Sequence, residues 1–245
     1  MKIGVIPDVQ MKPRVPIGHL GWIGDYFADK RPDVIVCLGD FGDLESLGDY
    51  DKGKKSYEGR RYSKDVDAVK RGMELFCNAL GKARGYSPRL ILTLGNHEDR
   101  IRRAVESDPK LEGTIDIADL GYKEFGWKVH PFLEVVKIGG VHFSHFFPSG
   151  VMGRPCTTAR KIISTYHVSA IAGHQQGRDV AYAKRGDGHN LTAIIAGSCY
   201  QHNESYLTPM ANKCWRGILM LHEVRDGQFD EMMVSLDFLK LRYGK

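Results

Sequence analysis

The stretch of sequence that decides the fold is VIVCLGDFGD, residues 34–43. Val34 to Leu38 is a continuous apolar run with β-branched residues, which is typical of a strand covered on both faces. A glycine ends the run, and the acidic side chain of Asp40 follows it at once. Two further runs end in a similar way, residues 2–6 before Asp8 and residues 90–94 before Asn96. The sequence therefore predicts several strands that each present a polar side chain at the carboxyl end.

Segments with helical spacing separate these strands. The apolar residues of Ile17 to Ala28 and of Asp65 to Ala83 recur at intervals of three and four, which predicts two amphipathic helices. Strand, helix, strand, helix, strand in this order predicts an α/β domain with a largely parallel sheet. In the second half we predict hairpins at residues 135–144, 179–196 and 218–236, a helix at residues 160–166 and a strand at residues 170–172.

The composition is that of an ordinary globular protein, with 42% hydrophobic and 27% charged residues. The 245 residues allow one large domain or two small ones. No clear linker divides them, so we expect a single domain over residues 1–245, with a basic loop insertion at about residues 44–64. No apolar run is long enough to span a membrane, which predicts that the protein has no membrane partner. The sequence does not indicate an oligomeric state.

Cysteine usage and charge set expectations about the surroundings. The five cysteines are scattered without C-x-x-C spacing, which argues against a disulfide framework and for a reducing compartment. The apolar stretch at the N-terminus is too short for a signal peptide, so we expect a cytoplasmic protein. The formal net charge of +5 is compatible with a polyanionic partner and favours one only weakly.

The polar residues that follow the strands are expected to meet. Ligands in an open α/β sheet gather at the carboxyl ends of the strands, so Asp8, Asp40 and Asn96 can converge although they are distant in sequence. Each motif taken alone could be an ordinary turn. Their ordered combination with His145 and with GHQQ, residues 173–176, favours a metal site over turns. Carboxylates, an amide and imidazoles are suitable ligands for two adjacent divalent cations, and two-metal sites hydrolyse phosphate esters.

The motifs in this order resemble those of the calcineurin-like metallophosphoesterase superfamily. That family's pattern is D-x-H, G-D-x-x-D/E, G-N-H-D/E, a lone His and then G-H-x-H, and the resemblance spans residues 8–176. It implies a two-sheet β-sandwich flanked by helices, with two metals at the top edge. It also implies that Asp40 bridges both metals, and that one metal site is completed by Asn96, His145 and His174.

The resemblance further implies roles for residues around this set. Asp8 would belong to the other metal site. His97 would sit close to the scissile phosphate without binding metal, as a candidate to stabilise the phosphate and protonate the leaving oxygen. Asp43 is expected to orient a ligand without binding metal itself. Glu98 and Arg100 are expected to pair beside the site, and a plain surface ion pair is the alternative.

The sequence departs from the family pattern at two positions, which both fall on the same metal. Gln10 stands where D-x-H has its histidine, and Gln176 replaces the second histidine of G-H-x-H. Glutamine can coordinate through its carbonyl oxygen, so this site would have only oxygen donors. Such a site suits Mn²⁺, Mg²⁺ or Ca²⁺, and of these we expect two Mn²⁺ ions, with the first bound more weakly than the second. The alternative is a lost metal and a degenerate site, against which Asp8, Asp40 and His97 all remain.

The reaction class is better defined than the substrate. The family mechanism uses a metal-bridging hydroxide for in-line attack on phosphorus, which serves monoesters and diesters alike. A general acid at His97 matters more for the poorer leaving group of an aliphatic diester, so we expect a phosphodiesterase. The alternatives are a phosphomonoesterase acting on proteins or nucleotides, and a catalytically silent scaffold.

A basic segment at residues 52–64 suggests DNA or nucleotides as the phosphodiester substrate. It follows the Asp40 motif and should line the rim of the site, where basic residues interleaved with tyrosine would suit a phosphate backbone with stackable bases. The alternative is a solvated basic loop. The residues expected to contact substrate are Lys54, Lys55, Arg60, Arg61, Arg100 and His202.

Overall fold

The computed structural model describes residues 1–244. Its strands are β1 Ile3–Ile6, β2 Val34–Cys37, β3 Arg89–Thr93, β4 Lys128–His130, β5 Val136–Ile138, β6 Val141–Ser144, β7 Pro148–Ser149, β8 Arg154–Pro155, β9 Ala170–Ala172, β10 Arg178–Lys184, β11 Asn190–Ala196, β12 Gly217–Arg225 and β13 Gln228–Ser235. Its α-helices are α1 Gly18–Lys30, α2 Tyr62–Leu80, α3 Asp99–Ser107, α4 Ala159–Tyr166 and α5 Leu236–Tyr243. Short 3₁₀ helices lie at Glu45–Leu47, Lys55–Tyr57, Pro109–Leu111, Ile117–Leu120 and Ala211–Lys213.

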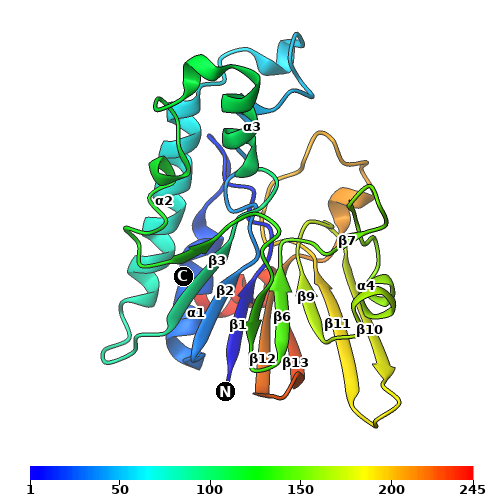
Figure 1. Ribbon diagram of the computed structural model, residues 1–245. Helices are drawn as coiled ribbons and strands as arrows, with labels where there is room; N and C mark the ends of the chain where they lie inside the picture. The colour runs from blue at the N-terminus through cyan, green and yellow to red at the C-terminus, as the bar shows by residue number, and fades with distance from the viewer. Residues whose placement is uncertain (245) are drawn as a thin grey trace.

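The strands form two main sheets that pack face to face between helices (Figure 1). One sheet has the order β13-β12-β1-β2-β3-β4, and the other has the order β10-β11-β9-β6-β5. Helices α1, α2 and α5 pack on the outer face of the first sheet, and α4 packs against β10 and β11 of the second. This arrangement confirms the expected two-sheet sandwich flanked by helices. No helix within residues 1–244 is long and apolar enough to cross a membrane.

Alternation along the buried strands creates the separate cores. In β2, Val34 and Val36 point into the core between the two sheets, whereas Ile35 and Cys37 point into the core under α1 and α2. All four side chains are fully buried. Because both faces of β2 are covered, each of its residues must be apolar, which explains the uninterrupted apolar run in the sequence.

Strand direction brings the loops together at one edge of the sandwich. Strands β1, β2, β3 and β4 are parallel neighbours, and in the second sheet β6, β9 and β11 are parallel neighbours. Strands β12 and β13 extend the first sheet in antiparallel fashion, so the sheet is only partly parallel. The predicted hairpins β5–β6, β10–β11 and β12–β13 are confirmed.

Several elements differ from the sequence expectations. The second helix was expected at Asp65 to Ala83, but α2 begins three residues earlier at Tyr62 and ends before Gly81. The last strand was expected to reach Leu236, which is instead the first residue of α5, because the Ser235 hydroxyl accepts the N–H of Phe238 and caps a helix. Helix α3 and the short strand β4 were not predicted, since neither carries a long apolar pattern.

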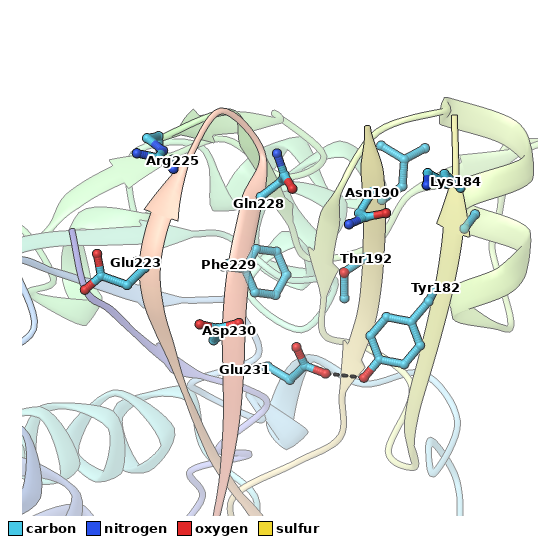
Figure 2. A pocket seen from close by; sticks show the side chains of 12 residues that line it. Tyr182, Lys184, Asn190, Thr192, Glu223, Arg225, Gln228, Phe229, Asp230 and Glu231 are labelled. Carbon is cyan, nitrogen blue, oxygen red and sulfur yellow. Dashed lines mark hydrogen bonds between the residues drawn. The ribbon is translucent and has the colours of Figure 1, made fainter. Parts of the chain in front are cut away.

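A groove separates the edges of the two sheets at the end of the sandwich opposite the converging loops (Figure 2). Its volume is about 580 Å³, and it lies between the β10–β11 and β12–β13 hairpins. Tyr182 on β10 donates a hydrogen bond to Glu231 on β13 and links the two edges across it. This groove is therefore distant from the polar motifs.

Candidate metal centre

Loops that follow five strands meet at the edge where the parallel strands end. Asp8 and Gln10 follow β1, Asp40 follows β2, and Asn96 follows β3 in the first sheet. His145 comes directly after β6, and His174 and Gln176 follow β9 in the second sheet. The ligand candidates are thus supplied by both sheets, and most of them are buried.

Four of these side chains form a compact group that contains both histidines. Asn96 Oδ1 lies 2.9 Å from His145 Nε2 and 2.7 Å from His174 Nδ1. Asp40 Oδ2 lies 3.4 Å from His145 Nε2. The ligand atoms of Asp40, His145 and His174 all lie within 4.8 Å of one another. Such spacing allows one cation to contact all of these donors.

The two imidazoles are held in the form that binds metal. His145 Nδ1 donates to the carbonyl oxygen of Leu38 at 2.8 Å, which directs Nε2 toward Asn96 and Asp40. In the neutral ring, Nε2 and the Asn96 oxygen are both acceptors, and a shared cation would reconcile them. Burial, together with the nearby His145, lowers the pKa of His174 to about 4, so this ring is neutral at physiological pH.

The remaining candidates form the half of the centre that contains the glutamines. Gln176 Nε2 donates to Asp8 Oδ2 at 2.9 Å, and Gln10 Nε2 donates to Asp40 Oδ2 at 3.2 Å. The carbonyl oxygens Oε1 of Gln10 and Gln176 are both buried and have no hydrogen-bond partner among residues 1–244. A buried acceptor without a partner is costly, and it is explained when a cation completes the site.

The two buried carboxylates Asp8 and Asp40 act on each other electrostatically. Burial raises the pKa of Asp8 to about 7, and the charge of Asp40 adds to this increase. Asp8 also accepts the backbone N–H of His174 at 2.9 Å. Two acidic groups that are fully buried side by side require cations or protons. The donor set of this half of the centre, all oxygen, fits a divalent cation of the Mn²⁺ or Mg²⁺ type.

The backbone is strained where it presents these ligands. Gln10, Asp40 and His174 have φ values of 52°, 47° and 67°, in the left-handed region that favours glycine. The loop after β3 packs directly on Asp40, so that a Cβ on Gly95 would lie 2.1 Å from Asp40 Oδ1. Only glycine fits at position 95.

Glu98 holds two of the ligand loops together. Its buried carboxylate accepts backbone N–H groups from Gly95 at 2.8 Å, Asp40 at 2.9 Å and Gly42 at 3.0 Å. It also accepts the hydroxyl of Tyr122 at 3.0 Å. The expected pairing of Glu98 with Arg100, in the site or on the surface, is therefore wrong, because backbone donors saturate this carboxylate.

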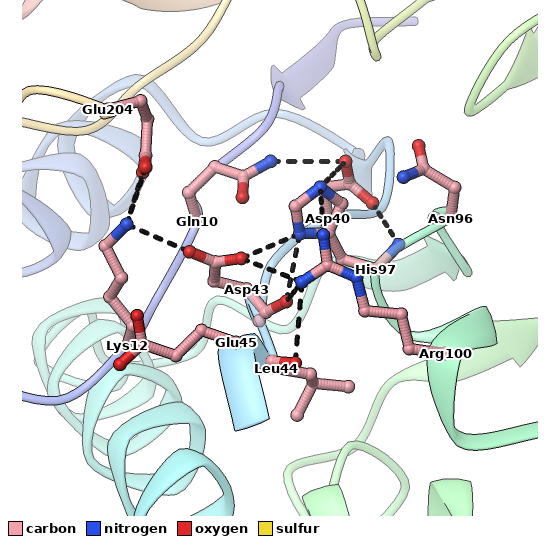
Figure 3. A network of polar contacts seen from close by, with 12 residues as sticks. Gln10, Lys12, Asp40, Asp43, Leu44, Glu45, Asn96, His97, Arg100 and Glu204 are labelled. Atoms are coloured by element: carbon pink, nitrogen blue, oxygen red, sulfur yellow. Dashed lines mark hydrogen bonds and ion pairs between the residues drawn. The ribbon is translucent and has the colours of Figure 1, made fainter. Parts of the chain in front are cut away.

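His97 lies beside the centre with its ring fixed by Asp43 (Figure 3). Its Nδ1 is 2.9 Å from Asp43 Oδ1, and its Nε2 is 3.7 Å from Asp40 Oδ2. Burial opposes protonation of His97, but the charge of Asp40 and the hydrogen bond to Asp43 outweigh it and raise the pKa to about 9. The ring therefore holds a proton near neutral pH. Asp43 was expected to orient a ligand, but it contacts His97 and Arg100 instead.

A buried ion-pair network continues from Asp43 to a distant part of the chain (Figure 3). Lys12 Nζ lies 2.9 Å from Asp43 Oδ2 and 2.6 Å from Glu204 Oε2, and Glu204 is only 2% exposed. Although burial works in the opposite direction, His97, Lys12 and Arg100 hold the pKa of Asp43 well below its usual range. Sequence reasoning missed Lys12 and Glu204, since nothing in a sequence relates residues so far apart.

His202 has a different place from the one expected. Its Nε2 lies 2.6 Å from Glu204 Oε1, and its ring stacks on Tyr200 with centroids 4.6 Å apart. His202 thus supports the buried Glu204 and does not line the cavities beside His97.

The basic segment is partly neutralised by its own carboxylates. Arg60 Nη2 lies 2.7 Å from Asp51 Oδ2, and Lys54 Nζ lies 3.4 Å from Asp51 Oδ1. Lys55 and Arg61 are exposed and have no carboxylate partner within residues 1–244. Of the expected substrate-contact residues, only Arg60 and Arg100 line the cavity next to His97.

Replacing Gly95 by alanine is expected to damage the centre directly. The new Cβ would clash with Asp40, so we expect a loss of about 1–3 kcal/mol in the free energy of unfolding and weaker metal binding. Denaturant titration and calorimetric titration with Mn²⁺ would measure the two effects. The matched control is Gly186→Ala, where nothing lies within 4 Å of the added Cβ. Similar behaviour of the two variants would contradict the packing described here.

Replacing Lys12 by methionine is expected to leave the buried carboxylate of Glu204 without a permanent cation, whereas Asp43 keeps His97 and Arg100. We expect a loss of about 3–5 kcal/mol in the free energy of unfolding, because a charge without its partner remains buried. The control is Lys82→Met, since Lys82 is 67% exposed and pairs with Asp25 on the surface, where a loss below about 1 kcal/mol is expected. If Lys12→Met proved as mild as its control in urea denaturation, the network would not contribute to stability.

Comparisons with known proteins find only distant similarity. No family model matches the chain, and no curated protein matches it. Among solved structures, the phosphoesterase YfcE from E. coli aligns over 96% of this chain and 100% of its own, with 12% identity and a TM-score of 0.39. A dimetal phosphatase from Danio rerio aligns over 96% of this chain and 99% of its own, with 12% identity and a TM-score of 0.45.

Proposed function

We propose that this protein is a metal-dependent phosphoesterase, a hydrolase whose centre holds two divalent cations. The observation that carries the proposal is the pair of buried carboxylates, Asp8 and Asp40, beside two glutamine oxygens that have no hydrogen-bond partner among residues 1–244. When bound, two adjacent cations supply an activated water and neutralise charge on the phosphate oxygens. Asp40, Asn96, His145 and His174 would hold one cation, and Asp8, Gln10 and Gln176 would hold the other together with Asp40.

The proposed metal is Mn²⁺, bound more weakly at the half with the glutamines. That half offers carboxylate and amide oxygens only, whereas the other half offers two imidazoles. Oxygen donors favour Mn²⁺ or Mg²⁺, and the two glutamine amides are weaker donors than the two imidazoles that replace them in the other half.

His97 is the proposed general acid. Asp43 holds its Nδ1, which leaves Nε2, 3.3 Å from Arg100 Nη2, as the nitrogen for a substrate, and the raised pKa keeps a proton on the ring. A proton donor is needed most when the leaving group is a poor one, which supports a preference for phosphodiesters. Nucleotide-type diesters are proposed over long nucleic acids, because Lys54 and Arg60 of the basic segment already pair with carboxylates.

The reaction itself can be tested with model esters. Methyl aryl phosphodiesters should be hydrolysed faster than the corresponding aryl phosphates, and only in the presence of divalent cations, with Mn²⁺ the most effective. His97→Gln should lower turnover by about 100-fold or more for poor leaving groups and by less for acidic phenols. The control is His142→Gln, which replaces a half-buried histidine within β6 and should leave turnover unchanged.

The same assay separates the alternatives. Faster turnover of monoesters would point to a phosphomonoesterase. Metal-bound protein without any turnover would point to a silent scaffold and would overturn the proposal. A loss in His97→Gln that is equal for all leaving groups would remove its role as the acid.

The role of the two glutamines can be tested by substitution with histidine. The double variant Gln10→His/Gln176→His would give this half of the centre two imidazole donors, so its affinity for Zn²⁺ should rise relative to Mn²⁺. Competitive titration of both metals in the variant and in the parent protein would measure the ratio. An unchanged ratio would show that these side chains do not contact the cation.

A further inference from the structure

Two cavities meet at His97 and Tyr206. The first, of about 390 Å³, is lined by Asp40, Asn96 and His174 of the proposed metal centre. The second, of about 300 Å³, extends from His97 past Arg100 toward the segment that carries Arg60. His97 and Tyr206 line both cavities. A substrate at the metal centre can therefore extend past His97 into the second cavity.

The position of His97 beside the metal centre indicates which part of the substrate enters the second cavity. A general acid must lie within hydrogen-bond reach of the oxygen that it protonates, which here is the leaving oxygen. The group attached to that oxygen then extends into the cavity on the same side. The volume of about 300 Å³ is at the lower end of the range for small-molecule sites.

Within residues 1–244, every permanent cation that lines the second cavity has a carboxylate partner. It is lined by the cations of Lys12, Arg60 and Arg100 and by the carboxylates of Asp43, Glu45, Asp51 and Glu204. Each cation is already engaged: Lys12 with Asp43 and Glu204, Arg60 with Asp51 at 2.7 Å, and Arg100 with Asp43 at 3.1 Å. The protonated ring of His97 also lines this cavity and pairs with Asp43, so four cations face four carboxylates and an additional phosphate would find no unpaired cation there.

The walls of the same cavity carry aromatic surface. Tyr50 stands on the segment before α2 and is 76% exposed, and Tyr206 stands on the segment that leads to β12 and is 44% exposed. Exposed tyrosine rings provide surfaces on which planar groups stack. Lys54 lies 3.7 Å from the centre of the Tyr50 ring, so it covers part of that surface.

We propose that this cavity binds the leaving group of the substrate and selects an uncharged, planar alcohol of at most nucleoside size. The inference rests on the proposed phosphoesterase function and adds the substrate class. It excludes substrates in which the leaving group bears a second phosphate, such as the interior of a nucleic-acid strand. The selective element is the engagement of Arg60 by Asp51 and Glu45, which removes the cation that an anionic group would need.

The test compares two leaving groups that differ in charge. Two methyl aryl phosphodiesters, whose phenols have matched acidity and of which one carries a sulfonate, are hydrolysed with Mn²⁺. In the parent protein we expect kcat/KM for the sulfonated ester to be lower by about tenfold or more, as for one unfavourable charge contact. In Asp51→Asn, and separately in Glu45→Gln, the ratio of the two kcat/KM values should shift toward the sulfonated ester, because Arg60 gains free charge.

The control variant changes a carboxylate far from the cavity. Asp25→Asn removes one carboxylate on the distant surface, where it pairs with Lys82, and should leave the ratio unchanged. Equal kcat/KM for both esters in the parent protein, or a ratio that moves in neither cavity variant, would overturn this inference and leave the proposed function standing. No metal-dependent hydrolysis of either ester would overturn both.

Discussion

The carboxylate of Asp40 is the feature on which the rest of the centre depends. It follows the central strand β2, accepts the backbone N–H of His97 at 2.9 Å and the amide of Gln10 at 3.2 Å, and lies near His145. Its own N–H is held by Glu98. Because it is buried and charged, every neighbouring loop must supply a donor or leave room for a cation. Several loops approach the Asp40 side chain closely. The positive φ of Asp40 and the need for glycine at position 95 are consequences of this close approach.

The strand-borne part of the centre could be predicted from the sequence. Apolar runs that end in Asp8, Asp40 and Asn96 indicate strands and their carboxyl ends, and topology then brings these residues to one edge. The roles of Glu98 and Asp43 could not be predicted in the same way. A motif specifies the type of a residue but not the groups that it contacts. A sequence also does not show which backbone N–H groups donate hydrogen bonds to a carboxylate. For this reason the sequence analysis paired Arg100 with Glu98, whereas in the structure Arg100 pairs with Asp43.

The part of the site that depends on long-range packing was also missed. Lys12 and Glu204 are joined by a hydrogen bond of 2.8 Å although most of the chain separates them. His202 was expected near the substrate because it follows a buried strand, but it hydrogen-bonds Glu204 instead. Residues 52–64 are rich in basic side chains, but their composition alone does not show how many of these charges are paired with carboxylates. Nearby carboxylates at Glu45 and Asp51 decide how much of that charge is free.

The paired charges in the cavity next to His97 also determine how strongly dissolved salt affects the electrostatics of that cavity. Mobile ions screen exposed charges over roughly 8 Å at physiological ionic strength, but they act far less on pairs that are already buried in contact. Lys12 and Glu204 have only 15% and 2% of their side chains exposed, so dissolved salt has little to screen there. The electrostatic character of this cavity is therefore set when the chain folds, and it stays nearly the same in dilute buffer and in concentrated electrolyte.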